Sequence, residues 1–251
     1  MSHIIQSLWI GGALSKMEVL SIKSFLDNGH EYHLYTYDSV TNVPDGAIIK
    51  DGNEILKKDE IFRYKNGSVS AFSNLFRFTL LFKKGGYWAD TDLICVKPFK
   101  FNQDIVIVTE PDRNYAENII TSCFFKLPKK SKEALEGIMI QRKNKLKILT
   151  GEMVWGSGPS CVKTLVNKYN LQKYLLSWNS VCSCAWQHYD SLLNSKYEKP
   201  NEKIINKFSE IPDNMIGVHL WNEVWRRNNR DKNKDYDKDC FYEKLKKKHN
   251  I

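Results

Sequence analysis

The sequence lacks several features that would have settled its class at once. Its 251 residues contain no run that approaches the roughly 18 consecutive apolar residues of a membrane-spanning helix. The opening stretch, MSHIIQSLWIGG, has neither a basic segment nor a small-residue cleavage site, so we expect no signal peptide. The spacings Cys-x-x-Cys and Gly-x-Gly-x-x-Gly are also missing, which excludes the commonest zinc and dinucleotide motifs. We therefore expect a cytoplasmic chain.

The cysteines do not form a recognisable framework. Cys182 and Cys184 share one side of an expected strand, and His188 is close in sequence, so a metal site there stays open. Free, buried thiols are the default expectation for all six. They are Cys95, Cys123, Cys161, Cys182, Cys184 and Cys240.

Positive charge is confined to two segments. Residues 126–148 hold eight lysines and arginines against two acidic residues, and residues 226–251 hold ten against five. These patches predict either a solvated, lysine-rich surface or contact with something anionic, such as a membrane surface, nucleic acid or a phosphorylated substrate.

Strand and helix patterns alternate along the chain, without repeats or a linker, which is typical of a single α/β domain. Ser15 and Glu18 form a capping box at the start of the first expected helix, and residues 41–68 are turn-rich. We expect strands at 4–10, 32–37, 87–89, 93–96, 105–109, 119–125 and 215–221. We expect helices from 16 to about 28 and at 70–84, 131–147 and 160–169, the last after a loop at 155–159.

The most informative segment is GGYWADTD, residues 85–92. Asp90 and Asp92 would point to opposite faces of an ideal strand, but a break in the strand would let both face one cation. Apolar strands on each side place these acids at the edge of the core, where uncompensated charge is costly. A divalent ion would offset that cost, since carboxylate oxygens suit Mg²⁺ or Mn²⁺, and such an ion in turn binds a diphosphate.

This segment, together with SNLFR at 73–77, resembles the DXD-containing sugar-binding region of family 32 glycosyltransferases. That family includes yeast mannosyltransferases, α-1,4-galactosyltransferases, enzymes of bacterial capsule and lipopolysaccharide synthesis and, more distantly, the large clostridial glucosylating toxins. Three other stretches resemble the family in the same order along the chain: 4–11 (IIQSLWIG), 158–159 (GP) and 218–222 (VHLWN).

The resemblance implies a GT-A fold, a Rossmann-like mixed sheet flanked by helices in one domain. The nucleotide-sugar half would be residues 1–110, the acceptor half 111–225, and 226–251 a basic C-terminal segment. It implies transfer of a hexose or N-acetylhexosamine from a nucleotide-sugar, with UDP favoured over GDP, by a retaining, Mn²⁺- or Mg²⁺-dependent mechanism. The acceptor would be a glycan, glycolipid or glycoprotein of surface polysaccharide biosynthesis.

Residue roles follow from the resemblance, position by position. Asp90, Asp92 and Arg77 would be catalytic, and Asp92 with His219 would hold the metal. Two departures leave the donor sugar open: Asn74 stands where the toxins have aspartate, and Trp88 where tyrosine is frequent. The implied nucleotide-sugar contacts are Trp9, Ile10, Gly11, Asn74, Arg77, Trp88, Asp90, Thr91, Asn118, Gly158, Trp221 and Asn222.

Several of these residues also have structural interpretations. Trp9, His219 and Trp221 suit a packed core equally, and Gly158 suits a turn before a helix. Glu110 and Asp112 follow a strand and would line the acceptor side. The alternative function is a non-catalytic module that binds anionic lipid or nucleic acid through the basic patches, and an inactive relative is a third hypothesis. Without a nucleic-acid motif, we expect no nucleic-acid partner; peripheral contact with an anionic membrane is a further hypothesis.

Overall fold

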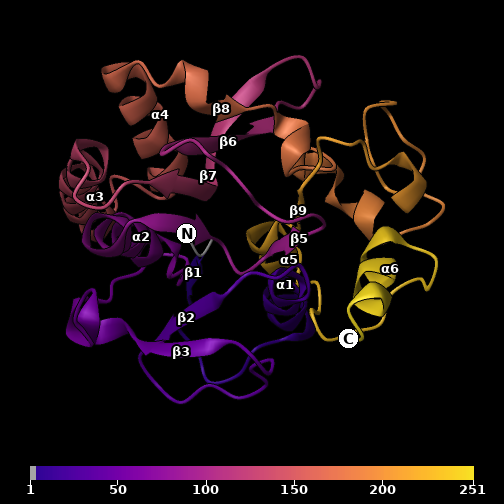
Figure 1. The fold of residues 1–251 in the computed structure, drawn as a ribbon, viewed down its shortest axis with the longest axis horizontal. Coiled ribbons are helices and arrows are strands. Elements are labelled where there is room, and N and C mark those ends of the chain that lie inside the picture. Colours follow the sequence, from indigo (N-terminus) through magenta and orange to yellow (C-terminus); the bar gives the residue numbers. More distant parts are fainter. Residues whose placement is uncertain (1–3) are drawn as a thin grey trace.

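The computed structural model describes residues 4–251. A seven-stranded mixed sheet forms the centre, helices cover both of its faces, and a separate two-stranded sheet packs beside it (Figure 1). In chain order the strands and α-helices are β1 (Ile5–Leu8), α1 (Lys16–Asp27), β2 (Tyr32–Thr36), β3 (Ile48–Asp51), α2 (Ser70–Lys84), β4 (Gly86–Ala89), β5 (Leu93–Cys95), β6 (Val106–Pro111), β7 (Asn118–Leu127), α3 (Lys132–Thr150), α4 (Ser157–Tyr169), β8 (Leu175–Leu176), β9 (Gly217–His219), α5 (Asn222–Arg227) and α6 (Phe241–Lys248).

The strand order in the large sheet is β3-β2-β1-β4-β7-β6-β8. Strands β1 to β4 are mutually parallel, β7 runs antiparallel to both β4 and β6, and β8 is parallel to β6. In the small sheet β5 pairs antiparallel with β9. The chain therefore builds outward from β1 in one direction, then returns to place β4 on the other side of β1.

Alternation along the strands creates a hydrophobic core on each face of the sheet. Tyr87 and Phe124 belong to the core shared with α1, β5, β9 and α6, whereas Trp88 and Phe125 belong to the core shared with α2, α3 and α4. The two helical groups lie on opposite sides of the sheet in Figure 1. The central strands β1 and β4 are buried on both sides. Strand β1 nevertheless contains Gln6 and Ser7, whose side chains donate to the Gly85 and Ala89 carbonyls.

Local sequence explains the helix boundaries next to the candidate site. The Glu18 carboxylate accepts from the backbone N–H of Ser15 at 2.9 Å and completes the expected capping box of α1. Helix α2 ends at Gly85, whose φ of +73° is unfavourable for other residues. A Cβ at Gly85 would also lie 2.7 Å from the backbone nitrogen of Lys129, so glycine is needed there for two reasons.

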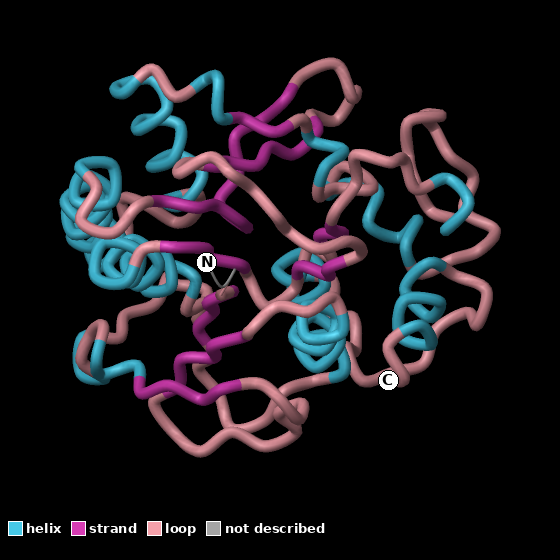
Figure 2. The backbone as a smooth tube through the Cα atoms, in the orientation of Figure 1, coloured by secondary structure: helices cyan, strands magenta, loops and turns pink. Residues whose placement is uncertain are grey.

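The chain after α4 consists mainly of loops and short 3-10 helices (Figure 2). The C-terminal residues are tied to α1: the Lys16 ammonium lies 2.7 Å from Asp235, and His249 Nδ1 lies 2.7 Å from Asp27. Within residues 4–251, no helix combines the length and the apolar composition needed to span a bilayer.

The predicted α/β architecture is confirmed, and most strands and helices that the sequence predicted are present with modest shifts at their ends. The strand expected at Cys182 and Cys184 is not formed: both residues lie in a loop between two 3-10 helices. Three further differences stand out. Residues 41–68 include the edge strand β3, α4 begins at Ser157 instead of residue 160, and the strand expected at 215–221 is only the three residues of β9. Strand β9 pairs with β5 in the separate two-stranded sheet and does not join the seven-stranded sheet.

Candidate active site

The site lies where the strand order reverses. Strands β1 and β4 are parallel neighbours, with Ile5 opposite Tyr87, while the chain between them forms β2 and β3 on the far side of β1. Ligands of open α/β sheets bind in the crevice beyond the carboxyl ends of such strands. Trp9 follows β1 directly and Asp90 follows β4 directly, so both stand at this crevice.

Asp90 is fixed by two donors on a single oxygen. Its Oδ1 accepts from Trp88 Nε1 at 2.7 Å and lies 3.0 Å from Arg77 Nη2, and its backbone N–H donates to the Cys123 carbonyl at 2.7 Å. Burial and the neighbouring Asp92 raise the pKa of Asp90, and the Arg77 guanidinium opposes this rise. The second carboxylate oxygen, Oδ2, is not used by these two donors.

Arg77 is almost completely buried, with 3% of its surface exposed. Its guanidinium donates to the Ser122 carbonyl and to Ser73 Oγ, and it lies over the Trp88 ring at 4.9 Å. The predicted contact between Arg77 and a donor sugar is untested, and the contacts that the structure gives Arg77 join α2 to Trp88, Asp90 and β7. Trp88 is also buried, with 1% of its surface exposed, and its contact with the site is the hydrogen bond from its indole N–H to Asp90.

Asp92 and His219 are brought together by the small sheet. Leu93 pairs with His219, which places His219 Nε2 3.3 Å from Asp92 Oδ2. The Asn222 backbone N–H donates to the same oxygen at 2.7 Å. Burial raises the pKa of Asp92, but His219 and this N–H lower it overall; burial lowers the pKa of His219, but Asp92, Asp90 and Glu110 raise it overall.

Trp221 joins β9 to α5 in a strained conformation. Its φ of +60° is unusual for a bulky side chain, and such outliers concentrate at functional sites. The Trp221 ring lies 4.2 Å from the His219 ring, centroid to centroid. This turn directs the backbone N–H of Asn222 at Asp92. Sequence patterns carry no sign of the turn, because tryptophan rarely adopts a left-handed conformation.

Helix α4 begins against α2. The Asn74 amide donates to Ser157 Oγ at 2.8 Å, and the Tyr64 hydroxyl donates to the same atom at 2.7 Å. A Cβ at Gly158 would lie 2.6 Å from both Asn74 Oδ1 and Ser122 Oγ, so only glycine fits. Asn74 and Gly158, predicted separately as donor contacts, therefore form one packed unit beside Arg77.

The other predicted residues occupy varied positions. Trp9, half-buried at the crevice, has an indole N–H without a hydrogen-bond partner among the described residues, and Lys232 lies over its ring at 5.4 Å. Gly11 packs beside that indole, where a Cβ would lie 3.2 Å from Nε1. Ile10 is half-buried and borders the α2-side core, and Thr91 sits half-buried in the turn between β4 and β5.

Asn118 lies apart from this group. It stands at the beginning of β7, five residues before Cys123, which is roughly 17 Å along an extended strand. Its Oδ1 accepts from Thr109 Oγ1 at 2.9 Å and from the Trp178 N–H at 2.8 Å. These bonds tie β6, β7 and the segment after β8 together, which is a structural use of the side chain.

Reasoning from the sequence missed Lys232 and gave Glu110 only a general place on the acceptor side. Burial raises the pKa of Glu110, and its carboxyl group interacts with His219, which places it at the border of the site. Its position after an apolar strand was the available signal. Nothing in the sequence marks Lys232, because its partners Trp9 and Glu18 lie more than 200 residues away.

The residues present fit a divalent ion. His219 Nδ1 is buried without a partner among the described residues, beside the carboxylate of Asp92. No group of three or more His, Cys, Asp and Glu side chains within residues 4–251 forms a complete protein cage. Mg²⁺ and similar ions are commonly held by only one or two carboxylates together with substrate phosphates, so this incomplete set suits them.

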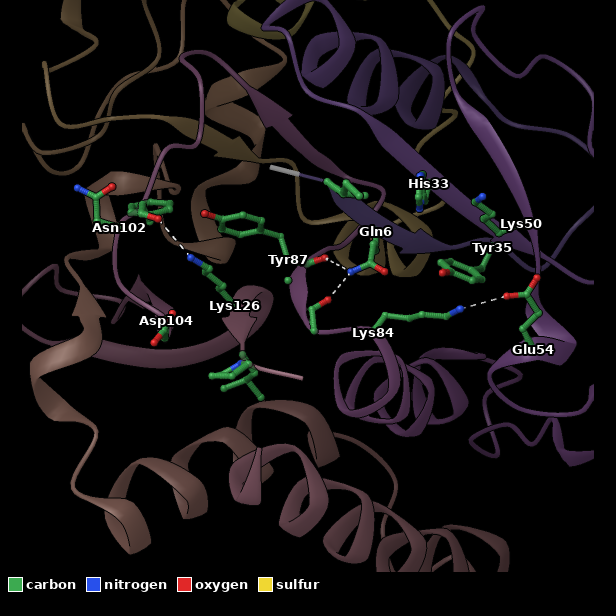
Figure 3. Close-up of a pocket in the computed structure, with 16 residues that line it drawn as sticks. Gln6, His33, Tyr35, Lys50, Glu54, Lys84, Tyr87, Asn102, Asp104 and Lys126 are labelled. Atoms are coloured by element: carbon green, nitrogen blue, oxygen red, sulfur yellow. Dashed lines mark hydrogen bonds and ion pairs between the residues drawn. The ribbon is translucent and has the colours of Figure 1, made fainter. Parts of the chain in front are cut away.

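A separate cavity of about 710 Å³ lies at the opposite edge of the sheet, near the beginnings of β1, β2 and β4 (Figure 3). Several of its polar side chains already have partners: Gln6 donates to the Gly85 and Tyr87 carbonyls, Lys84 lies 3.4 Å from Glu54, and Lys126 donates to the Gln103 carbonyl. It contains neither aspartate of the DXD segment.

Comparison with known proteins agrees with this geometry. Residues 15–112 match a protein family described as "Glycosyltransferase sugar-binding region containing DXD motif". A comparison with curated proteins gives no match. Among solved structures, the PaToxG glycosyltransferase is similar with a TM-score of 0.51 and 16% identity, over 68% of this chain and 72% of that one. At this identity the likeness establishes the fold alone.

Two further solved structures are similar at lower scores. The galactosyltransferase LgtC, solved with donor and acceptor sugar analogues, has a TM-score of 0.48 and 8% identity over 87% of each chain. The UDP-bound glycosyltransferase domain of the YGT toxin has a TM-score of 0.44 and 10% identity, over 91% of this chain and 77% of that one.

The chain has a GT-A fold. Its match to a glycosyltransferase sugar-binding region supports a transferase enzyme. Residues 15–112 match the model of a glycosyltransferase sugar-binding region with a DXD motif, and the matched part contains Asn74, Arg77, Asp90 and Asp92. The resemblance to a DXD-containing sugar-binding region that was stated from the sequence is thereby confirmed.

Proposed function

We propose that this protein is a metal-dependent, retaining transferase of a hexose or an N-acetylhexosamine, with a UDP-sugar preferred to a GDP-sugar as donor. A glycan, glycolipid or glycoprotein of surface polysaccharide biosynthesis is the proposed acceptor. The observation that carries the proposal is the convergence of Asp90, Asp92 and His219 at the carboxyl ends of β1 and β4. Three ionisable groups at a sheet's switch point are arranged for a charged ligand.

Asp92 is the proposed metal ligand, with His219 beside it. When bound, Mn²⁺ or Mg²⁺ would neutralise charge on the departing nucleoside diphosphate. The Asn222 N–H and His219 hold the Asp92 carboxylate in its ionised form, which is the form that binds a cation. The peptide turn at Trp221 positions both partners.

Asp90 is proposed to bind hydroxyl groups of the donor. Arg77 and Trp88 both engage Oδ1, which fixes the orientation of the carboxylate and directs Oδ2 to another partner. A ribose or sugar hydroxyl that donates to Oδ2 would be placed beside Asp92. Trp9, whose indole N–H has no partner among residues 4–251, is proposed to lie against the nucleotide base.

Retention needs no protein nucleophile in a front-face mechanism. The acceptor hydroxyl attacks on the face from which the diphosphate departs, and a phosphate oxygen takes its proton. Glu110, whose pKa is raised by burial, is proposed to border the acceptor hydroxyl. The cytoplasm remains the proposed location, and six unpaired cysteines are compatible with it.

A donor-hydrolysis screen tests the proposal. Purified protein with Mn²⁺ is given a panel of UDP- and GDP-sugars, and release of nucleoside diphosphate is followed. One donor should turn over, and both a chelator and Asp92→Asn should abolish the reaction. Asp59→Asn, at an exposed aspartate of a 3-10 helix, is the matched control and should retain activity. Absence of turnover together with absence of nucleotide binding would refute the proposal, and NMR of the released anomer decides retention.

A further inference from the structure

Exposed apolar side chains are concentrated on one helix. Of the ten large apolar residues that the described chain leaves exposed, six lie between residues 135 and 155. Scattered exposed apolar residues are ordinary, but a contiguous group marks an interaction surface. The six are Leu135, Met139, Leu146, Leu149, Val154 and Trp155.

Four of these side chains form a stripe along α3. At about 100° per residue, positions 135, 139, 146 and 149 fall within an arc of roughly 80°. They are 45% to 67% exposed. The opposite face carries Gly137, Gln141, Asn144 and Ile148, which are buried against α2 and α4. The stripe is therefore the outward face of a helix at the periphery of the molecule (Figure 1).

Positive charge borders this stripe on both sides. By the same helical geometry, Lys143 and Lys147 lie along one side and Lys145 lies along the other. Arg142 lies within the stripe and is 3.9 Å from Glu60. Lys143 and Lys147 are exposed and have no acidic partner within residues 4–251. The one acid near this flank, Glu136, is neutralised by Lys168 at 2.9 Å. Apolar residues flanked by lysines are the pattern of helices that lie in the surface of an anionic bilayer.

The other basic segment does not share this pattern. Helix α6 buries its apolar residues Phe241, Tyr242 and Leu245 and exposes mainly lysines, such as Lys244 and Lys247. Charge without exposed apolar surface predicts a solvated face. Nucleic acid would make use of the lysines of α3 but would not require exposed leucines beside them. Helix α3 has both exposed apolar side chains and flanking lysines, whereas α6 has exposed lysines only. A lipid surface is therefore the favoured partner for α3 and not for α6.

We propose that the stripe on α3, with the adjoining residues 151–155, docks on the surface of an anionic lipid bilayer. The helix would lie in the plane of the interface, its leucines among the acyl chains and its lysines at the headgroups. This inference goes beyond the proposed function, because docking requires no transfer reaction. Residues 151–155 lead directly into Ser157, which bonds Asn74, so the docking surface adjoins the wall of the active site.

Vesicle co-sedimentation tests the proposal, using phosphatidylcholine with and without phosphatidylglycerol. The full chain should bind only the anionic vesicles. Leu146→Glu with Leu149→Glu should weaken binding by at least about 20-fold, since burial of two leucines is lost. The matched control, Ile48→Glu with Ile49→Glu on the exposed edge strand β3, should bind as the parent does.

The charge contribution is tested separately on side chains whose removal leaves the core intact. Lys143→Ala with Lys147→Ala should weaken binding about 25-fold, at about fivefold for each lysine. Lys244→Ala with Lys247→Ala is the control and should have no effect. Donor hydrolysis without vesicles should be unchanged in all four variants, which separates docking from catalysis. Absence of binding, equal binding to neutral vesicles, or loss of binding only in the α6 variant would overturn the proposal.

Discussion

Replacement of Arg77 by methionine should destabilise the protein in a pH-dependent manner. Methionine fills much of the volume but leaves the Ser122 carbonyl, Ser73 Oγ and Asp90 without their charged donor. Breaking a buried ion pair costs roughly 3–5 kcal/mol, and the 27% exposure of the Asp90 side chain reduces this, so we expect about 2–4 kcal/mol at pH 7.

The pH dependence follows from Asp90. Burial already raises its pKa despite the opposing Arg77, and loss of Arg77 raises it further. The penalty of the variant is therefore full above its new pKa and becomes smaller as the pH falls and Asp90 is protonated. Urea unfolding followed by circular dichroism at pH 8 and pH 5 measures the difference.

A double variant isolates the pair. Adding Asp90→Asn to Arg77→Met removes the unpaired carboxylate and should recover at least about 1 kcal/mol of the loss at pH 8. Three results would refute this reasoning: a loss in the free energy of unfolding below about 0.5 kcal/mol for Arg77→Met, an equal loss at pH 8 and pH 5, or a further loss when Asp90→Asn is added.

Three other substitutions give separable outcomes. Gly158→Ala should cost about 1–3 kcal/mol, because its Cβ would strike Asn74 at 2.6 Å; an unchanged melting temperature would contradict this. Asp235→Asn should lower the melting temperature at pH 7, because Lys16 and Lys246 stabilise the ionised carboxylate and lower the pKa of Asp235 to about 2. The loss should therefore become smaller between pH 4 and pH 2. A loss that does not depend on pH, or an equal loss in the Asp213→Asn control, would refute this prediction. Trp9→Phe should weaken UDP binding about three- to tenfold in calorimetry with a melting temperature within about 3 °C of the parent; unchanged affinity would show that the indole N–H makes no ligand contact.

Local patterns predicted most of the fold. The capping box at Ser15 and the glycines at 85–86 mark helix ends that depend only on nearby residues, and the structure has both ends there. The edge strand β3 was missed because its Ile48 and Ile49 face solvent, so no buried face imposes a pattern. Helices α5 and α6 are short and depend on tertiary contacts that periodicity does not reveal.

The site was predictable in composition but not in arrangement. The DXD segment and the His219 stretch were singled out separately, and only the pairing of β5 with β9 explains why they meet. Arg77 and Trp88 were expected at the ligand, whereas their packing turns both toward Asp90. These orientations depend on which face of α2 packs against β4. Local sequence patterns do not specify that packing, which is set by the complete fold.

The pairing of β5 with β9 also sets the order in which the site can be assembled. Leu93 and His219 are partners across 126 positions, and such distant contacts form late because closing a long loop is entropically costly. All strands of the large sheet lie before residue 177, but Asp92 lacks His219 until β9 pairs with β5. We therefore expect a molecule in which β9 has not yet paired with β5 to lack the charge cluster of the candidate site, and donor hydrolysis to begin only after this pairing has formed.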